Sequence, residues 1–191
     1  VLPIRATSIR NAWDFYKPIH QMPHPNMDLK NATNVYITAC LCAYKTFVEK
    51  ANLAKGDLLT KYKYFVFHGA NNYMPKVAFH KIYEWIVDHE VDRKTDETLN
   101  QLFEDKIRPS MAICARTGSN YTSAVYLNLI SLFTNGDFAE PTDILVYSYG
   151  SGCASTLFQL HVDSPPLIPP AFDYLDHRSY KSIPEFMEIH E

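Results

Sequence analysis

The pattern of hydrophobic and polar positions predicts a strand followed by a helix near the middle of the chain. An aromatic and β-branched run from Tyr62 to Phe67 is typical of a short buried strand. From Met74 to Ile86 the apolar residues recur at the spacing of one helical face. Between the two elements, His68 begins a turn of small and polar residues. An imidazole is therefore expected at the carboxyl end of a strand, where ligands gather in α/β sheets.

Further elements are expected before and after this pair. Residues 1–30 contain several prolines and are expected to be irregular, with one short helix. A helix is expected over residues 34–53, with Gly56 as its stop signal. Residues 88–105 have the spacing of a second, more exposed helix. The apolar run at 110–115 then predicts a second strand.

The remaining third of the chain predicts a buried helix and a pair of strands. Residues 120–133 are apolar almost all round, as in a helix inside a large fold. The runs at 144–148 and 154–162 flank a glycine-rich turn and predict a β-hairpin. Residues 163–191 have the composition of a peripheral, proline-rich linker and tail. The order of strands and helices predicts an α/β fold, with a mixed sheet covered by helices in a single domain.

Composition narrows the class of protein. The 191 residues suit one globular domain, with 47% hydrophobic and 20% charged residues. A net charge of −3 leaves no basic excess for nucleic acid or an anionic membrane. The sequence contains no apolar run of about 18 residues, so no membrane span is expected. The first residues resemble the interior of a longer polypeptide rather than a start or a signal peptide.

The four cysteines predict neither a disulfide framework nor a metal site. Cys40 and Cys42 are two apart on an expected helix and therefore point to different faces. Cys153 follows a glycine-rich turn and is the best candidate for a nucleophile, although buried packing is the favoured reading. His20 and His24 are separated by a proline, which argues against a helical metal site. The cysteine usage fits a reducing, cytoplasmic compartment.

Three turns collect the residues that could carry chemistry. His68 lies in the first, Ser119 and Asn120 in the second, and Ser151 in the hairpin turn. If the first two strands run parallel, their loops open on the same rim, and a helix beginning at Asn120 would aim its free N–H groups there. His68 could then transfer protons near neutral pH. Ser151 lacks the outer glycines of a nucleophile elbow, so a serine hydrolase is disfavoured.

Several motifs together resemble the C-terminal half of 3-hydroxy-3-methylglutaryl-CoA synthase, of the thiolase superfamily. The sequence NAWDFYKP (11–18) is similar to the family's AYDFYKP, and FVFH (65–68) matches the strand that carries its catalytic histidine. The sequence TGSNYTSAVYLNLISLF (117–133) resembles NGNMYTSSVYGSLASVL, and VYSYGSGCASTLFQL (146–160) resembles VFSYGSGLAATLYSL. The resemblance extends in order along nearly the whole chain, including DLKNATNVYITACLCAY (28–44) and LDHR (175–178).

The resemblance implies half of a layered αβαβα fold and a Claisen-type condensation of acetyl-CoA with acetoacetyl-CoA. It implies that His68 is the acid/base that serves the acetoacetyl group. It also implies that Ser151 and an asparagine hold the substrate and its thioester. The CoA thioesters are substrates, and no cofactor or metal is implied. The family is usually dimeric, so a homodimer is expected.

Some family positions are altered in this chain. The family's asparagine falls on Ser119, with Asn120 one place later. A CoA-binding lysine falls on Tyr73, and a second falls beside Lys76. A substrate-contacting serine falls on Ala32. Loss of a charged or polar contact weakens binding by about 1–3 kcal/mol, so these changes put CoA affinity in question.

The family's nucleophilic cysteine and its glutamate base belong to an N-terminal half that this chain does not contain. That half is expected either in the same polypeptide or as a separate chain, and the isolated chain is expected not to catalyse condensation. Two alternatives remain. One is a non-catalytic homologue that binds an acyl-CoA or a partner subunit. The other is a β-branching synthase that uses acyl groups bound to a carrier protein.

Overall fold

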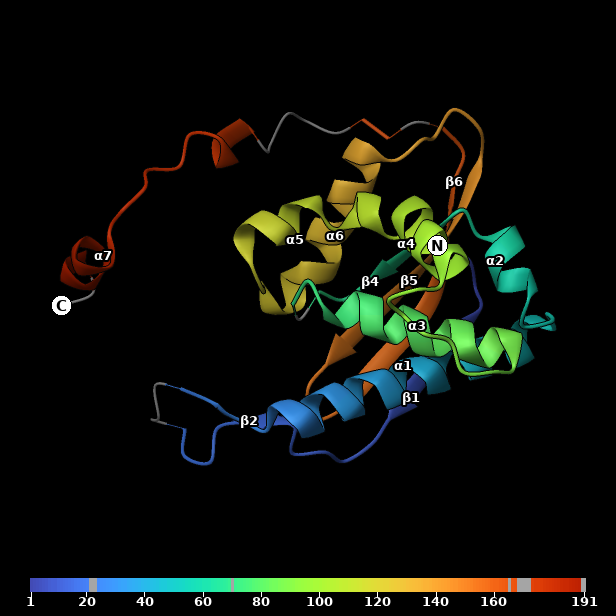
Figure 1. Cartoon of the computed structure of the whole chain (residues 1–191), viewed down its shortest axis with the longest axis horizontal. Helices are drawn as coiled ribbons and strands as arrows, with labels where there is room; N and C mark the ends of the chain where they lie inside the picture. The colour runs from blue at the N-terminus through green and yellow to red at the C-terminus, as the bar shows by residue number, and fades with distance from the viewer. Residues whose placement is uncertain (21–23, 70, 165, 168–172, 190–191) are drawn as a thin grey trace.

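A computed structural model shows a four-stranded sheet with helices packed on both faces (Figure 1). It describes all of the chain except residues 21–23, 70, 165, 168–172 and 190–191. The strand order is β1-β6-β5-β4, which mixes parallel and antiparallel neighbours. This arrangement confirms the mixed α/β class expected from the sequence.

The centre of the sheet is a parallel pair next to a hairpin. Strand β4 (Tyr64–Phe67) pairs in parallel with β5 (Thr142–Gly150). Strand β5 turns back into β6 (Ala154–Val162), which confirms the expected hairpin. All four residues of β4 are buried because helices cover the sheet on both sides. The continuous apolar run that predicted β4 is typical of such a strand.

One face of the sheet packs against α1 (Leu29–Ala51), α3 (Met74–Val87) and α4 (Glu97–Lys106). The three helices were expected from their apolar spacing. The ring of Tyr44 on α1 stacks against those of Phe65 and Phe67, which point to this face of β4. Side chains of α3 and α4 fill the rest of this core. The helix that follows His68 is therefore fixed to the sheet by its whole apolar face.

The opposite face packs against α6 (Ala124–Asn135), preceded by a single 3₁₀ turn, η2 (Tyr121–Ser123). Alternate residues of the central strands, Tyr64, Val66 and Val146 among them, form this second core. The helix is not buried all round, contrary to the expectation from its composition. The side chain of Tyr126 on this helix is 62% exposed, whereas Val125 and Leu132 on the sheet side are buried.

The expected strand at 110–115 is wrong. Residues Arg108–Ser110 form a 3₁₀ turn (η1), and Ala112–Thr117 form helix α5. A six-residue apolar run does not distinguish strand from helix by its periodicity. Tertiary contacts decide the matter, since the Ser131 hydroxyl accepts from the Ala112 N–H at 3.0 Å and donates to Pro109 O at 2.9 Å. The segment thus packs against α6 and takes no place in the sheet.

Two further expectations need correction. Helix α1 ends at Ala51 because Asn52 takes the left-handed conformation (φ 50°, ψ 49°), whereas Gly56 precedes a short helix, α2 (Asp57–Lys61). The first thirty residues are also not wholly irregular. Strand β1 (Arg5–Ile9) pairs with the outer side of β6, and β2 (Phe15–Tyr16) pairs with β3 (Asn26–Met27).

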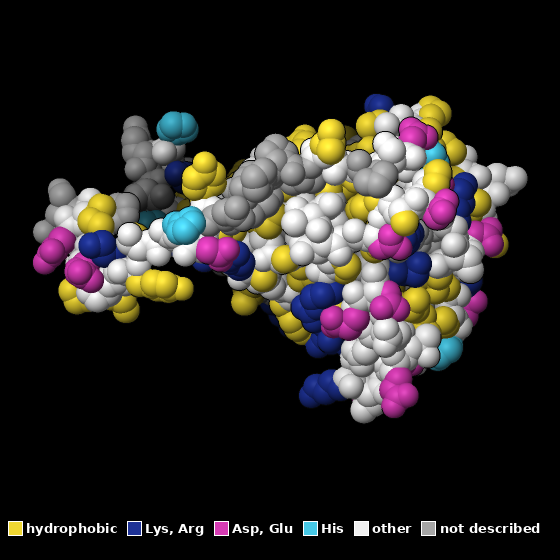
Figure 2. Space-filling view, turned by 90° about the horizontal axis from the view of Figure 1, so that it is seen from above, with side chains coloured by type: hydrophobic (Ala, Val, Ile, Leu, Met, Phe, Trp, Pro, Cys, Tyr) yellow, Lys and Arg dark blue, Asp and Glu magenta, His cyan; other side chains and the backbone are white. Residues whose placement is uncertain are grey.

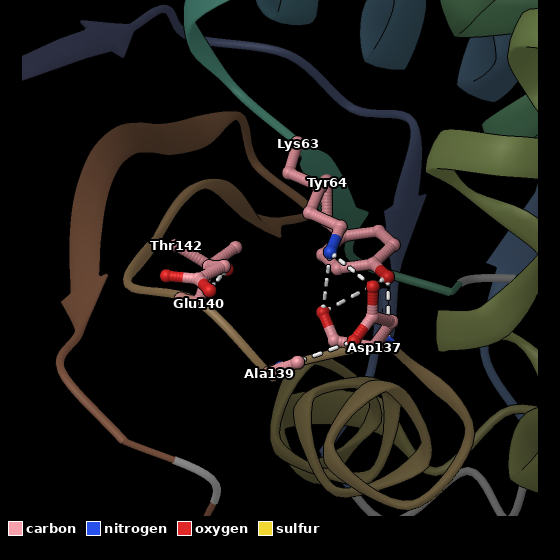
Figure 3. Close-up of polar contacts among 6 residues, drawn as sticks. All are labelled: Lys63, Tyr64, Asp137, Ala139, Glu140 and Thr142. Atoms are coloured by element: carbon pink, nitrogen blue, oxygen red, sulfur yellow. Dashed lines mark hydrogen bonds and ion pairs between the residues drawn. The ribbon is translucent and has the colours of Figure 1, made fainter.

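A polar cluster ties the end of α6 to the start of β4 (Figure 3). Lys63 Nζ donates to the Asp137 carbonyl at 2.7 Å and to its carboxylate at 2.8 Å. The Asp137 N–H donates to the Tyr64 hydroxyl at 2.7 Å. The carboxylate also accepts from Ala139 N–H at 3.0 Å. The cluster holds the α6–β5 connection beside the first residue of β4, and so helps to set the register of the parallel pair.

The C-terminal segment leaves the body of the molecule. It contains a 3₁₀ turn, η3 (Asp173–Leu175), and helix α7 (Ile183–Ile189). An ion pair between Asp176 and Arg116 attaches the segment to α5, while the segment itself stands apart with hydrophobic side chains on its surface (Figure 2). Within the described part of the chain, helices are too short or too polar to cross a bilayer.

Candidate functional site

His68 stands directly after β4, where backbone hydrogen bonds fix its position. Its N–H donates to Tyr147 O at 2.8 Å, which extends the parallel ladder by one residue. Its carbonyl accepts from the Tyr36 hydroxyl at 2.9 Å. The preceding carbonyl, of Phe67, accepts from the Asn128 amide at 2.9 Å. Elements on both faces of the sheet therefore hold the backbone of His68 in place.

The imidazole of His68 is buried, with 8% of the residue exposed. Burial lowers the pKa of His68 below its ordinary value of 6.5. The ring is therefore neutral near pH 7, with one nitrogen able to accept a proton and the other able to donate one. Such a group can transfer a proton to and from a bound molecule.

His68 lines a pocket of about 300 Å³ at the carboxyl end of the parallel pair. The walls come from the β4–α3 turn, the hairpin turn, the start of α1 and the α5–α6 loop. The residues that line it are Asp14, Phe15, Met27, Leu29, Ala32, Thr33, Tyr36, His68, Asn71, Met74, Ser119, Tyr121, Thr122, Tyr149, Gly150 and Ser151. Its mixture of aromatic, aliphatic and hydroxyl groups suits a neutral, moderately polar acyl group.

The structure brings together four of the residues singled out in the sequence. His68, Ser151, Ser119 and Ala32 all line this pocket. Ser151 occupies the hairpin turn next to the end of β5, and Ser119 lies in the loop after α5. The second loop therefore reaches the expected rim although the element before it is a helix. The reason is that α5 packs against α6 beside the sheet.

Three other candidates lie outside the pocket lining. The ring of Tyr73 is 55% exposed and lies 4.9 Å from the Arg93 guanidinium. Lys76 Nζ lies 5.6 Å from the centroid of the Phe103 ring on α4. The Asn120 amide donates to the Thr117 hydroxyl at 2.8 Å and to the Gly118 carbonyl at 2.9 Å. Lys76 and Asn120 thus have partners within the chain.

Sequence reasoning did not assign a role to Asp14 or Tyr149. Asp14 is only 1% exposed, and its carboxylate accepts from the Tyr149 hydroxyl at 2.6 Å. The Gly152 N–H donates to the same carboxylate at 2.8 Å. Burial alone would raise the pKa of Asp14, but these hydrogen bonds outweigh it and hold the pKa below its ordinary value. The only sequence signal was that Asp14 belongs to the DFYKP motif.

The thiols do not offer a nucleophile in this pocket. All four cysteines are free, and none of them is among the lining residues. Burial raises the pKa of Cys40, Cys114 and Cys153, which keeps these three thiols protonated near pH 7. Cys153 is 1% exposed and packs in the core, in agreement with the favoured reading of the sequence.

Comparison with protein families decides the relationship. The family model described as "Hydroxymethylglutaryl-coenzyme A synthase C terminal" matches residues 2–84 and 76–167. The chain belongs to this family. The C-terminal hydroxymethylglutaryl-CoA synthase region includes every residue that lines the pocket, and the motif-based resemblance is confirmed.

Individual relatives agree with the family match. "Hydroxymethylglutaryl-CoA synthase 2" of Blattella germanica is 28% identical and covers 85% of this chain. The "Curacin Biosynthetic Pathway HMG Synthase in Complex with Acetyl Donor-ACP" has a TM-score of 0.83, with 20% identity over 97% of this chain. "MvaS in complex with 3-hydroxy-3-methylglutaryl coenzyme A" has a TM-score of 0.71, with 20% identity over 85% of it. The two structures establish the fold as that of this synthase family.

The match is to one half of the relatives. The chain covers 44% of the Blattella protein, 44% of the curacin synthase and 42% of MvaS. The sheet of this chain with its two helical layers thus corresponds to part of the thiolase-like fold of these proteins.

Proposed function

We propose that this chain supplies the histidine-bearing half of an enzyme that condenses acetyl-CoA with acetoacetyl-CoA to 3-hydroxy-3-methylglutaryl-CoA. The observation that carries the proposal is the placement of His68. A buried, neutral imidazole stands at the carboxyl end of a parallel strand, inside a pocket that also presents Ser119 and Ser151. The family match supports the reaction class.

In this proposal His68 acts as the acid in carbon–carbon bond formation. A carbanion from the acetyl thioester attacks the ketone carbon of the acetoacetyl group, and the carbonyl electron pair moves to its oxygen. His68 takes up a proton on its free ring nitrogen and passes it to that oxygen, so that an alcohol forms in place of an alkoxide and the ring is neutral again. The hydroxyls of Ser119 and Ser151 hold the substrate and its thioester by hydrogen bonds.

The cysteine that carries the acetyl group and the glutamate base are proposed to come from a second half, joined in cis or provided as a separate chain. The described thiols cannot take this role, because none lines the pocket. We propose a homodimer of the assembled protein. Free thiols at all four cysteines fit a cytoplasmic location, which we propose as well.

The test is an assay of condensation with and without the N-terminal half of a family member. The 191-residue chain alone should show no turnover. The assembled protein should be active, and His68→Gln should lower kcat by about 10²–10⁴-fold, the usual contribution of a general acid. His161→Gln is the matched control, since His161 lies on β6, paired with Asp143 away from the pocket. Turnover by the isolated chain, or full activity of His68→Gln, would contradict the proposal.

One observation favours a second candidate function, in which the acyl group is delivered on a carrier protein and not on CoA. Tyr73 stands where the family resemblance implies a CoA-binding lysine, and Lys76 lies against Phe103 on α4. The described residues that line the pocket therefore include no lysine or arginine to hold CoA phosphates. A carrier-protein thioester would not need them, and neither would a non-catalytic binding module.

Binding measurements separate these candidates. A thermal-shift titration with acetyl-CoA and with an acetylated carrier protein compares the two forms of the acyl group. Stabilisation by acetyl-CoA supports the CoA-dependent enzyme. Stabilisation by the carrier protein alone supports the carrier-protein-dependent one. If the assembled protein binds a thioester but shows no turnover, the chain is better described as a non-catalytic homologue.

A further inference from the structure

Among the described residues that line the pocket, Asp14 is the one acidic group, and it lies in the loop between β1 and β2. It is almost completely buried, with 1% of the residue exposed. A buried carboxylate is costly to keep unless its oxygens are hydrogen-bonded. Both oxygens of Asp14 have such partners, and both partners belong to the hairpin that carries Ser151.

The two hydrogen bonds span the hairpin turn. Oδ2 accepts from the Tyr149 hydroxyl at 2.6 Å, and Oδ1 accepts from the Gly152 N–H at 2.8 Å. Ser151 lies between these two anchoring residues. The loop is itself held to the turn, because Arg10 N–H donates to Cys153 O and Ala12 N–H to Gly152 O, both at 2.9 Å. The carboxylate therefore links Tyr149 and Gly152, which lie on either side of Ser151, and holds the turn between them.

The same contact holds an aromatic wall beside His68. The ring of Tyr149 lies 6.3 Å from that of His68 and 5.0 Å from that of Tyr36, centroid to centroid. Tyr36 in turn donates its hydroxyl to the His68 carbonyl at 2.9 Å. Since Tyr149 donates its proton to Asp14, its hydroxyl oxygen can offer only lone pairs to other groups.

We propose that Asp14 is a positioning residue, which fixes Tyr149 and the Ser151 turn against His68. The importance of Asp14 for catalysis rests on the proposed function of His68. Its effect on the positions of Tyr149 and the Ser151 turn is independent of that function. Asp14 lies in an N-terminal loop, 135 and 138 residues away in the sequence from its two partners in the hairpin. The pocket is thus completed by a contact between two distant parts of the chain.

The test follows the imidazole of His68 by nuclear magnetic resonance in the folded chain, with ¹⁵N-labelled histidine. Asp14→Asn leaves a side chain of the same size but removes one acceptor and the negative charge. Tyr149→Phe removes only the hydroxyl. We expect both variants to displace the His68 ring signals. The double variant should cause no more displacement than the larger single one, because both substitutions break one contact.

Asp143→Asn is the matched control. Asp143 belongs to the same hairpin and is hydrogen-bonded to His161 at 2.6 Å, at the opposite end of β5 from the pocket. This variant should leave the His68 signals unchanged. If Asp14→Asn fails to fold, Tyr149→Phe alone decides. Unchanged His68 signals in a folded variant, or an equal displacement in Asp143→Asn, would overturn the proposal.

The signals of His68 need no thioester, so failure of the proposed reaction and failure of this proposal are distinguishable. In the assembled protein, Asp14→Asn should lower kcat by about tenfold to hundredfold, with less effect on KM, since a small displacement of catalytic groups has that cost. A loss confined to thermal stability would show that Asp14 serves only the fold.

Discussion

At the scale of single residues, the protonation of His68 depends on its burial. The pKa of His68 is lowered because the charged ring would lose its hydration in the folded chain. The unfolded chain therefore binds a proton more readily than the folded one at mildly acidic pH. The stabilising contribution is complete above the ordinary pKa of 6.5 and is lost as the pH falls through the lower folded value.

We predict that His68→Gln weakens the acid sensitivity of the chain. The free energy of unfolding should fall between pH 7.5 and pH 5 in the original chain, and the fall should be smaller in the variant. Urea denaturation at both pH values measures it. His161→Gln should act in the opposite sense, because the hydrogen bond to Asp143 raises the pKa of His161. Parallel pH profiles of the original chain and His68→Gln would exclude a titrating His68.

A second residue-scale prediction concerns Tyr73. Tyr73 is exposed in the turn between His68 and α3, where the family resemblance implies a lysine. Tyr73→Lys should raise the affinity for acetyl-CoA by up to about fivefold, the value of an exposed ion pair with a phosphate. Isothermal titration calorimetry measures the change. Tyr180→Lys adds the same charge at a position that is 98% exposed in the C-terminal segment, and should have no effect.

The positions of some residues in the fold could be predicted from the sequence, and those of others could not. His68 could be predicted because a strand pattern stops immediately before it. Asp14 could not be assigned a partner, because the residues that bind its carboxylate are 135 and 138 positions away. Local periodicity contains no information about a contact of that kind. Lys76 shows the converse, since a suitable residue type close to the expected position packs against a neighbouring helix.

At the scale of elements, periodic apolar patterns predicted α1, α3, α4 and the hairpin. The parallel pairing of β4 with β5 was not predicted, because it joins residues 64–67 to residues 144–147 across helices α3 to α6. The expected strand at 110–115 failed for a related reason. A short apolar run fits either conformation, and packing against α6 determines which one forms. Elements longer than about ten residues are more reliable, since their period is repeated.

The contact between the His68 turn and α6 gives an element-scale prediction. A methyl group added at Gly69 would lie 3.1 Å from the Asn128 amide nitrogen, which is fixed by its hydrogen bond to Phe67 O. Gly69→Ala should therefore destabilise the chain by about 1–2 kcal/mol, as overpacking does in a core. Chemical denaturation measures the difference in the free energy of unfolding.

Gly56→Ala is the control for that substitution. No heavy atom lies within 4 Å of the added methyl group, and the backbone has ordinary helical angles (φ −65°, ψ −27°). Alanine should fit without strain and stabilise the chain by about 0.4–1 kcal/mol through the unfolded state. Equal effects at Gly56 and Gly69 would show that the approach to Asn128 has no cost.

At the scale of the whole molecule, the outer face of α6 is incompletely covered. Tyr126 and Ile130 occupy one side of the helix at the i and i+4 positions, and Tyr126 is 62% exposed. The helix has an apolar composition typical of a buried element. The chain covers 44% of the Blattella relative, and under the proposed function the N-terminal half would cover this face.

We therefore predict that the isolated chain self-associates through the outer face of α6. Tyr126→Arg should shift sedimentation towards the monomer, because an exposed charge opposes apolar association without disturbing the core on the other side. Tyr180→Arg is the matched control, as it changes a tyrosine that is 98% exposed and lies outside the body of the molecule. Addition of the N-terminal half should have the same effect as Tyr126→Arg on the original chain. The N-terminal half should also bind the Tyr126→Arg variant more weakly than it binds the original chain. If Tyr126→Arg left both self-association and binding unchanged, the outer face of α6 would not be the surface that the other half covers.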